Sequence, residues 1–294
     1  MQYEGVVYRP PSEANSLILQ ATIGCAHNRC AFCNMYREKR FRIRKPEEIK
    51  KDIDWAEQHY PPEEIRSIFL ADGNTILMKT PQLIELLQYA YRKFPYLQRA
   101  TVYGASQYLA RKSPQDFQDL RNAGLTRLHC GMESGSDSVL RRVNKGGTRA
   151  THIKGGLLVR NAGIELSMYY MPGLGGLDMW EEHAGESAGV LNEVNPDFIR
   201  LRTFIPIAGT PMADDYLAGK FKLMNALQVI AEIRLLIAGL EGINSLLLSD
   251  HWSNFLSLHG QMPQEKANLL RAADEALTMP LSAFRDIGMT HGTL

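Results

Sequence analysis

The sequence predicts an α/β fold built on a parallel sheet, either a partial (β/α)6 barrel or an open doubly wound sheet. Short apolar runs alternate with longer amphipathic segments about six times along the chain, which is the pattern of strands joined by crossover helices. The 294 residues, 45% of them hydrophobic, are enough to bury one large core. In either arrangement the loops that follow the strand C-termini form the functional site.

Six apolar runs have the length and the composition of buried parallel strands. We expect these strands within residues 16–24, 65–72, 99–106, 125–132, 164–171 and 196–204.

Helix start signals stand between these runs. Pro46 lies in the first turn of a helix over 45–59, and Thr80 and Ser113 are expected to cap the helices that follow them, each with a proline directly after it. Gly124 and Gly163 stand where helices should end, because glycine readily adopts the left-handed conformation of a helix C-terminus.

The rhythm changes at about residue 205. Residues 205–216 are rich in turn formers, 221–240 form a strong helix, and one more helix is expected around 264–277. We therefore expect an N-terminal extension at 1–15, a core at 16–210, and a C-terminal helical cap at 211–294 that packs on the core.

The charge balance limits the classes of partner. Lys plus Arg number 33 and Asp plus Glu number 32, so no global field favours nucleic acid or a membrane surface. The chain also has no apolar run of membrane-spanning length, and its first residues lack the order of a secretory signal. We expect a cytoplasmic protein, and we expect its thiols to be reduced there.

Three of the four cysteines lie within nine positions, in "CAHNRCAFC". Cys25, Cys30 and Cys33 follow the first strand with the spacing C-x4-C-x2-C. Thiolates on such an irregular loop can converge on one soft metal centre. Three unrelated core cysteines are a poor alternative, because the residues between the first two are polar.

Two other metal sites remain open on the residues alone. Zinc would need a fourth ligand such as His27 or His59, although structural zinc sites usually pair their ligands and only one C-x2-C pair exists here. An electron carrier of the plant ferredoxin type would use Cys130 as its fourth cysteine, nearly a hundred residues downstream.

The three cysteines, with an aromatic residue directly before the third and a position after the first strand of a (β/α) barrel, resemble the radical S-adenosylmethionine (SAM) superfamily. The resemblance covers roughly residues 16–210 and implies a partial (β/α)6 TIM-like barrel. The usual spacing in that superfamily is C-x3-C-x2-C, one residue shorter than here. "GMESGSDSVLRRVNKGGT" at 131–148 resembles the fourth-strand signature of the branch that holds coproporphyrinogen dehydrogenases and methylthiotransferases.

The resemblance implies the cofactors and the chemistry. Cys25, Cys30 and Cys33 hold three irons of a 4Fe-4S cluster, and the fourth iron binds SAM. Reductive cleavage of SAM then yields a 5'-deoxyadenosyl radical that abstracts hydrogen from a substrate. Such an enzyme is oxygen-sensitive and needs an electron donor such as flavodoxin or ferredoxin.

The resemblance also implies which residues contact SAM. Gly73, in "FLADGNT", contacts the methionine amino group through its backbone, Glu133 approaches the ribose or the amine, and Lys145 faces the methionine carboxylate. "YYMPGLGG" at 169–176 matches the turn after the fifth strand. Three residues complete the expected SAM site: Phe32, Leu201 and Arg202, all beside the adenine.

Each assignment has a structural alternative. Glu133 is also suited to accept from helix N-terminal amides, Lys145 to be solvated, and Gly73 to serve only its turn. Ser106 either faces the cofactor or only satisfies backbone groups.

His129 and Cys130 lie side by side on the fourth strand. Because side chains on a strand alternate, His129 shares its face with Glu133 and is a weak catalytic candidate, with a core histidine as the alternative. Cys130 then points at the helices as a small core residue.

Two further segments are unusual. "REKRFRIRK" at 37–45 holds six basic side chains, which either grip an anionic substrate or form a solvated loop. "SDHWSNFLSLHG" at 249–260 either closes the open side of the barrel near the substrate or packs as an ordinary amphipathic stretch.

We therefore expect a radical SAM enzyme with an unidentified substrate, a small molecule first and RNA second. One spare cysteine leaves no room for a second cluster, which argues against methylthiotransferases. The first strand begins by residue 16, so no N-terminal cobalamin-binding domain is expected.

Overall fold

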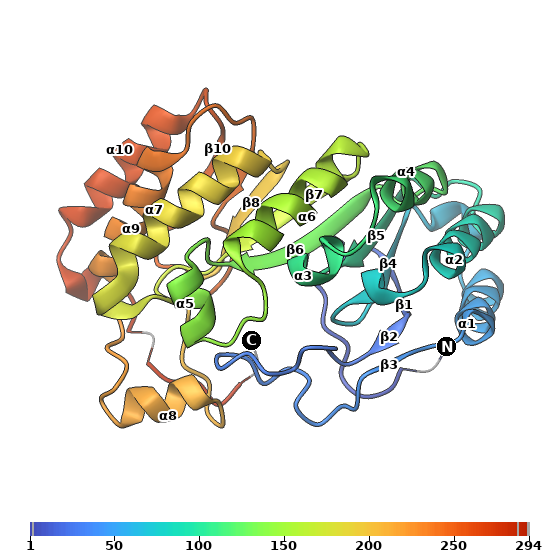
Figure 1. The fold of residues 1–294 in the computed structure, drawn as a ribbon, viewed down its shortest axis with the longest axis horizontal. Coiled ribbons are helices and arrows are strands. Elements are labelled where there is room, and N and C mark those ends of the chain that lie inside the picture. Colours follow the sequence, from blue (N-terminus) through green and yellow to red (C-terminus); the bar gives the residue numbers. More distant parts are fainter. Residues whose placement is uncertain (2, 287, 293–294) are drawn as a thin grey trace. The chain divides into compact units, whose positions relative to one another are not determined.

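The computed structural model describes residues 1, 3–286 and 288–292 of the chain as a mixed α/β fold (Figure 1). One sheet holds eight strands in the order β1-β4-β5-β6-β7-β8-β9-β10, and β2 with β3 forms a small second sheet. The strands are β1 (Leu17–Gln20), β2 (Thr22–Ile23), β3 (Arg42–Ile43), β4 (Ser67–Ala71), β5 (Arg99–Tyr103), β6 (Arg127–Glu133), β7 (Glu165–Tyr170), β8 (Phe198–Leu201), β9 (Leu246–Leu248) and β10 (His259–Gln261). All six predicted strands are confirmed.

The pairing of the strands is mostly parallel, as predicted. β1 pairs with β4, β4 with β5, β5 with β6, β7 with β8 and β8 with β9 in parallel, whereas β10 is antiparallel to β9. The last two strands come from the tail that was expected to be a helical cap. The run Leu246–Leu248 is apolar throughout, and a strand of that composition is stable where it continues a sheet and is covered on both faces.

The chain divides into two compact units. Unit 1 holds residues 1–28, 36–130 and 154–166, and unit 2 holds residues 29–35, 131–153 and 167–294. β1, β4, β5 and most of β6 belong to unit 1, while most of β7 and all of β8, β9 and β10 belong to unit 2.

The helices of unit 1 follow the predicted starts with one exception. Ser113 caps its helix in a reciprocal capping box with Asp116. Thr80 is the first helical residue and not the cap, because Lys79 stands at the cap position and the Thr80 hydroxyl accepts from Lys112 Nζ at 3.0 Å. The helices are α1 (Pro46–His59), α2 (Thr80–Lys93), α3 (Ser106–Leu109) and α4 (Pro114–Asn122), with short 3-10 turns at Pro11–Glu13, Pro62–Glu64 and Thr75–Leu77. α6 (Arg149–Asn161) has residues in both units.

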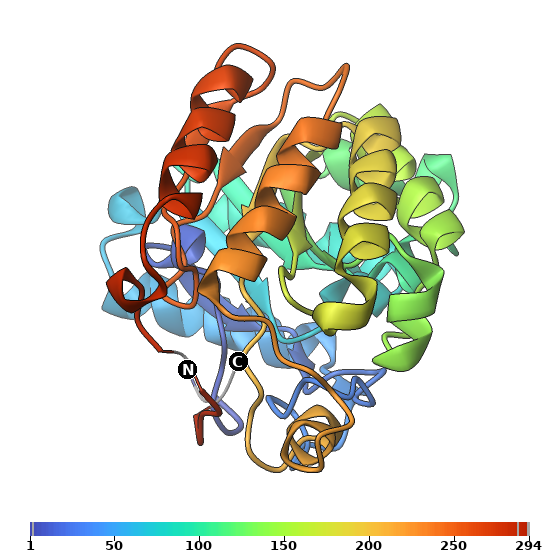
Figure 2. The ribbon, with the colours of Figure 1, turned by 90° about the vertical axis from the view of Figure 1, so that its left-hand side faces the viewer.

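In unit 2, helix α9 lies between α7 and α10 (Figure 2). α9 begins after Asn225, whose side chain forms a capping box with Gln228. One short helix, α8, lies largely within the stretch that is rich in turn formers, and the Thr210 hydroxyl starts it by accepting from Ala213 N. The helices are α5 (Asp137–Arg142), α7 (Gly176–Val194), α8 (Pro211–Leu217), α9 (Ala226–Gly239) and α10 (Lys266–Leu277), with a 3-10 turn at Leu281–Ala283.

Two glycines end helices as expected. Gly124 and Gly163 have φ of 105° and 74°, in the region that glycine adopts without a steric penalty.

The strands of unit 1 present one apolar and one mixed face. Alternate residues Ile68, Leu70, Ala100, Val102, Leu128 and Cys130 are buried as a hydrophobic core. Cys130 is 1% exposed, which confirms that it is a core residue. None of the helices in the described part of the chain is both long and apolar enough to span a membrane.

Candidate active site

In unit 1, the turn after β4 packs against the loop that carries Cys25. Gly73 N donates to Gly24 O at 3.2 Å, and Asn74 Nδ2 lies 3.5 Å from Cys25 Sγ. A Cβ atom on Gly73 would lie 3.1 Å from Gly24 O and 3.2 Å from Cys25 Cβ. Position 73 therefore needs glycine so that the two segments can approach closely.

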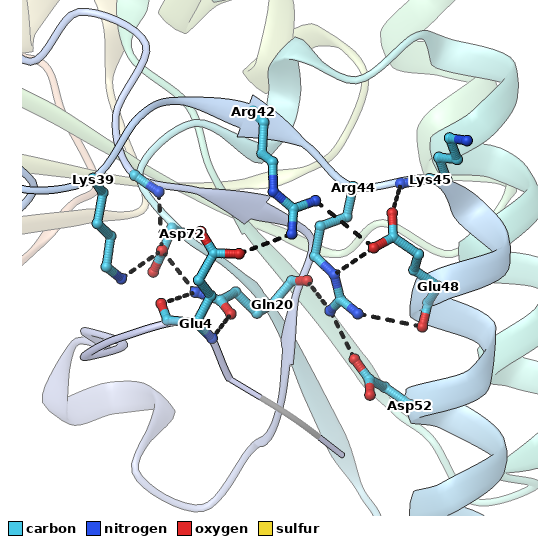
Figure 3. A network of polar contacts seen from close by, with 10 residues as sticks. Glu4, Gln20, Lys39, Arg42, Arg44, Lys45, Glu48, Asp52 and Asp72 are labelled. Carbon is cyan, nitrogen blue, oxygen red and sulfur yellow. Dashed lines mark hydrogen bonds and ion pairs between the residues drawn. The ribbon is translucent and has the colours of Figure 1, made fainter.

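Asp72 fixes the start of the cysteine loop and was not singled out in the sequence. Its Oδ2 accepts from Gln20 Nε2 at 3.0 Å, from Gly24 N at 3.1 Å and from Lys39 Nζ at 3.2 Å (Figure 3). Burial raises the pKa of the Asp72 carboxyl above its ordinary value, although these donors work in the opposite direction. The only sequence signal is its place, directly after a buried strand and before Gly73.

The basic segment 37–45 is largely bound to acids of its own unit. Arg44 Nη1 lies 2.7 Å from Asp52 Oδ2, and Arg42 Nη2 lies 2.9 Å from Glu4 Oε2 (Figure 3). Together with the Lys39–Asp72 pair, these contacts use three of the six cations within the fold. Half of the basic side chains of this segment therefore stabilise the fold of unit 1.

In unit 2, the part of the loop with Cys30 and Cys33 is held by its backbone. Ala31 N donates to Val143 O at 2.8 Å, and Ala31 O accepts from Met212 N at 3.0 Å. Both cysteines pack against a hydrophobic cluster that contains Phe32. Phe32 is 3% exposed, and the other buried members are Val139, Val143, Met171, Leu174, Phe204, Met212 and Phe221.

The chemistry of the donor set fits a cluster of iron and sulfur. Cys25, Cys30 and Cys33 lie on one irregular segment, and each is partly exposed. Soft thiolates are the ligands that such clusters use. Among residues 1, 3–286 and 288–292, no three His, Cys, Asp or Glu side chains are already gathered as a metal site. The ligand set stays a prediction.

Glu133 and Lys145 come together in unit 2 as a partly buried ion pair. Lys145 Nζ donates to Glu133 Oε1 at 2.9 Å and also lies 5.7 Å from the centre of the Phe32 ring. A Cβ atom on Gly131 would overlap Glu133 Oε1 and lie 3.2 Å from Lys145 Nζ. The expected contacts of Glu133, Lys145 and Phe32 with SAM stay predictions.

Ser106 begins helix α3 and does not end a strand. The residue is 1% exposed, and within the described residues its hydroxyl has no hydrogen-bond partner. A buried hydroxyl of this kind is costly unless another group satisfies it, so its position is compatible with a bound cofactor.

Leu201 and Arg202 stand at the end of β8 in unit 2. Leu201 is buried, and Arg202 N donates to Tyr170 O at 3.1 Å. Burial and the Arg202 guanidinium lower the pKa of His251 to about 4, so His251 is neutral at pH 7.

The segment 249–260 holds the end of β8 through Asn254, one of the polar residues that make this segment unusual. Its Oδ1 accepts from Thr203 N at 2.8 Å, and its Nδ2 donates to Leu201 O at 2.8 Å. Leu201 and Arg202, which are predicted to lie beside the adenine, therefore stand at a strand end that Asn254 fixes.

His129 belongs to a network of contacts at the N-terminal ends of the unit 1 strands. It is 1% exposed, and its Nε2 lies 3.3 Å from Glu13 Oε1. Glu13 also contacts Arg99, the first residue of β5, and Arg127, the first residue of β6. These contacts support the interpretation of His129 as a core histidine.

Solved structures with the same fold are radical SAM proteins. The structure of methylornithine synthase (PylB) matches with a TM-score of 0.53 and 17% identity, over 94% of this chain and 71% of that one. Coproporphyrinogen III oxidase (HemN) from Escherichia coli matches with a TM-score of 0.53 and 17% identity, over 76% of this chain and 51% of that one. OxsB, solved with aqua-cobalamin and S-adenosylmethionine, matches with a TM-score of 0.56 and 15% identity, over 76% of this chain and 41% of that one.

This chain therefore spans only about half of the length of the last two proteins. Likeness at these identities shows the fold alone, a partial TIM-like barrel of the radical SAM type. Another protein with this fold, TsrM from Kitasatospora setae, was solved with cobalamin and a [4Fe-4S] cluster.

The sequence itself gives the family. No curated protein sequence matches the chain, but the family model of the radical SAM superfamily matches residues 19–186, more than half of its length. This match spans the cysteine loop, Gly73 and the Glu133–Lys145 pair. It confirms the prediction from the cysteine motif: the chain belongs to the radical SAM superfamily of enzymes.

Proposed function

We propose that Cys25, Cys30 and Cys33 hold a [4Fe-4S] cluster and leave one iron for S-adenosylmethionine. When bound, this cluster supplies the electron and the open iron site that reductive cleavage of SAM requires, which leads to hydrogen abstraction from a substrate. The class of reaction that follows hydrogen abstraction depends on the substrate.

One observation supports the proposal most directly: three cysteines lie on one segment whose backbone is held within each unit. Gly73 and Asp72 bind the backbone of Gly24 just before Cys25, and Ala31 is bound by Val143 and Met212 between the other two cysteines. Backbone that is already held beside a ligand loses less conformational entropy when that ligand is bound.

The residues proposed for SAM supply complementary groups. Lys145 offers a cation to a carboxylate, Glu133 an anion to an amine or hydroxyl, and Ser106 a buried hydroxyl. Gly73 brings its backbone close, while Phe32, Leu201 and Arg202 are proposed to border the adenine.

A small molecule remains the proposed substrate class. RNA is less favoured because three cations of the basic segment are bound to Asp72, Glu4 and Asp52. A reducing donor such as flavodoxin or ferredoxin is the proposed partner, and the clustering of three of the four cysteines favours a reducing compartment such as the cytoplasm.

An electron carrier with Cys130 as the fourth ligand has less support. Cys130 lies in strand β6, 1% exposed, within the apolar core of unit 1. Structural cysteines that are buried in an apolar core are inert as a rule.

The test is formation of 5'-deoxyadenosine. The protein is reconstituted anaerobically with iron and sulfide, reduced with dithionite and given SAM, and 5'-deoxyadenosine and methionine are quantified together with bound iron and zinc. We expect iron, not zinc, and 5'-deoxyadenosine in the wild type and in Cys130→Ser. We expect neither product from Cys25→Ala, Cys30→Ala or Cys33→Ala. Zinc in the purified protein, or loss of the cluster in Cys130→Ser, would contradict the proposal.

A further inference from the structure

A fully buried histidine and a fully buried glutamate face each other in unit 2. His183 on α7 and Glu232 on α9 are each 0% exposed, and His183 Nδ1 lies 3.0 Å from Glu232 Oε1. The same carboxylate accepts from Tyr170 OH at 2.5 Å and from Gly173 N at 3.0 Å. Tyr170 OH also lies 3.3 Å from His183 Nδ1.

The second nitrogen of His183 faces the backbone of Glu133. Nε2 lies 3.1 Å from Glu133 O, and Met171 N donates to the same oxygen at 3.0 Å. A carbonyl oxygen can only accept, so His183 Nε2 must carry hydrogen and donate. His183 therefore bridges Glu232, through Nδ1, and the carbonyl oxygen of Glu133, through Nε2.

Glu133 has an unfavourable backbone conformation, which the contact with His183 can stabilise. Its φ is 63°, in the left-handed region that is unfavourable for a residue with a side chain. The conformation lets the carboxylate meet Lys145 Nζ at 2.9 Å. Two hydrogen bonds to the carbonyl oxygen of Glu133 offset the cost of this turn.

We propose that His183 is a positioning residue for S-adenosylmethionine: it locks the left-handed backbone of Glu133, and Glu232 holds the imidazole ring for this task. The inference rests on the proposed function, in which the Glu133 carboxylate contacts SAM. Neither residue touches SAM in this account. Both act through the direction of the Glu133 side chain.

Two amide variants separate the two nitrogens of His183. In His183→Gln, the side-chain amide nitrogen can stand near the place of Nε2 and keep the donation to Glu133 O. In His183→Asn, the amide nitrogen stands near the place of Nδ1, so it keeps the contact with Glu232 and loses the one with Glu133. Both variants remove the ring, so a purely structural role predicts similar losses for both.

The measurement is the dissociation constant of SAM for the anaerobically reconstituted protein, by isothermal titration calorimetry. We expect His183→Asn to bind about tenfold more weakly, in the range seen when a supporting residue behind a ligand is removed, and His183→Gln to stay within about threefold of the wild type. In a Glu133→Gln background, His183→Asn should cause no further loss, because the residue through which it acts is already changed. Tyr170→Phe is the control, since it removes the hydroxyl that contacts Glu232 and His183 Nδ1 and leaves the contact of His183 Nε2 with Glu133 O in place.

The outcomes separate this inference from the proposed function. Equal affinity in His183→Asn and the wild type, equal losses in both amide variants, or an additive loss in the double variant would overturn the role of His183 while SAM binding itself stands. A wild type that binds no SAM would overturn both.

A second readout does not depend on SAM or on a stable variant. The ¹⁵N spectrum of histidine-labelled wild-type protein, assigned through His183→Gln or through through-space contacts with Tyr170, should show hydrogen on Nε2 of His183. A His183 ring without hydrogen on Nε2 would overturn the inference even if the variants failed to fold.

Discussion

The two units each contain a buried histidine beside a buried carboxylate, and the two pairs lie at different ends of their strands. In unit 1, His129 faces Glu13, which also reaches Arg99 and Arg127 at the first residues of β5 and β6. In unit 2, His183 faces Glu232 and reaches the carbonyl of Glu133, the last residue of β6.

The different positions of the two pairs match a general property of parallel α/β folds. The N-terminal ends of the strands are used for stability, and the C-terminal ends carry the chemistry. Glu13 ties an N-terminal turn to the starts of strands, so its loss should weaken the fold. His183 supports the end of a strand, so its loss should weaken ligand binding.

The largest effect on stability is expected for Glu13→Gln. The amide leaves His129 and Arg99 without the carboxylate that they face, and breaking a buried ion pair of this kind costs about 3–5 kcal/mol. The free energy of unfolding, measured by urea denaturation, should fall by that amount. The dissociation constant of SAM, measured at a temperature where the variant is folded, should not change.

Glu165→Gln is the matched control for this variant. Glu165 also pairs with Arg127, at 2.9 Å, but its side chain is 46% exposed, so its loss should cost less than about 1 kcal/mol. Similar losses in both variants would remove the distinction between the buried network and the surface pair.

A third buried histidine, His152 in unit 2, has no carboxylate beside it and should make the fold sensitive to acid. It is 1% exposed, and within the described residues neither ring nitrogen has a hydrogen-bond partner. Burial, with a smaller effect of Lys145, lowers the pKa of His152 from its ordinary value of 6.5 to about 3. Between these two pH values, His152 is protonated in the unfolded chain and neutral in the folded chain.

The free energy of unfolding should therefore fall as the pH drops below 6.5, by about 1.4 kcal/mol per pH unit from this residue alone. Urea denaturation between pH 4 and pH 7 measures the slope. The slope should be shallower in His152→Leu and unchanged in His259→Gln, a variant of an exposed histidine. An identical slope in His152→Leu and the wild type would show that His152 is not the source.

The smallest effect is expected for Gly131→Ala. The new methyl group would overlap the end of the Glu133 side chain and crowd Lys145, both of which can move, so the fold should survive. The displaced pair should bind SAM about tenfold more weakly, which corresponds to about 1.4 kcal/mol. Isothermal titration calorimetry measures the dissociation constant.

Gly185→Ala is the control for a methyl group added in the same unit. A Cβ atom at this position of α7 would meet nothing within 4 Å, so affinity should stay unchanged and stability should rise slightly. Unchanged SAM affinity in Gly131→Ala would contradict the placement of SAM beside the Glu133–Lys145 pair.

The sequence was sufficient to predict the parallel strands, most helices and the family, because these depend on local patterns. Apolar runs of strand length, caps such as Ser113 and the cysteine spacing are all visible within a few residues. The strand β9 escaped prediction because three leucines in a tail do not reveal which neighbour they pair with.

The polar residues that fix the site were harder to find because their partners are distant in the chain. Asp72 meets Gln20 across 52 positions, and Asn254 meets Leu201 across 53. Glu232 left one signal: it is a lone acid within the apolar stretch "LQVIAEIRLLIAG" of α9. An acid on the buried face of a helix indicates a buried partner, but the sequence does not show that the partner is His183.

The most direct test of the central claim is electron paramagnetic resonance of the reduced, anaerobically reconstituted protein with and without SAM. The account predicts the signal of a single [4Fe-4S]⁺ cluster that changes when SAM is added, in the wild type and equally in Cys130→Ser. A cluster whose signal does not respond to SAM would contradict the account, because it would mean that no iron is left open for SAM.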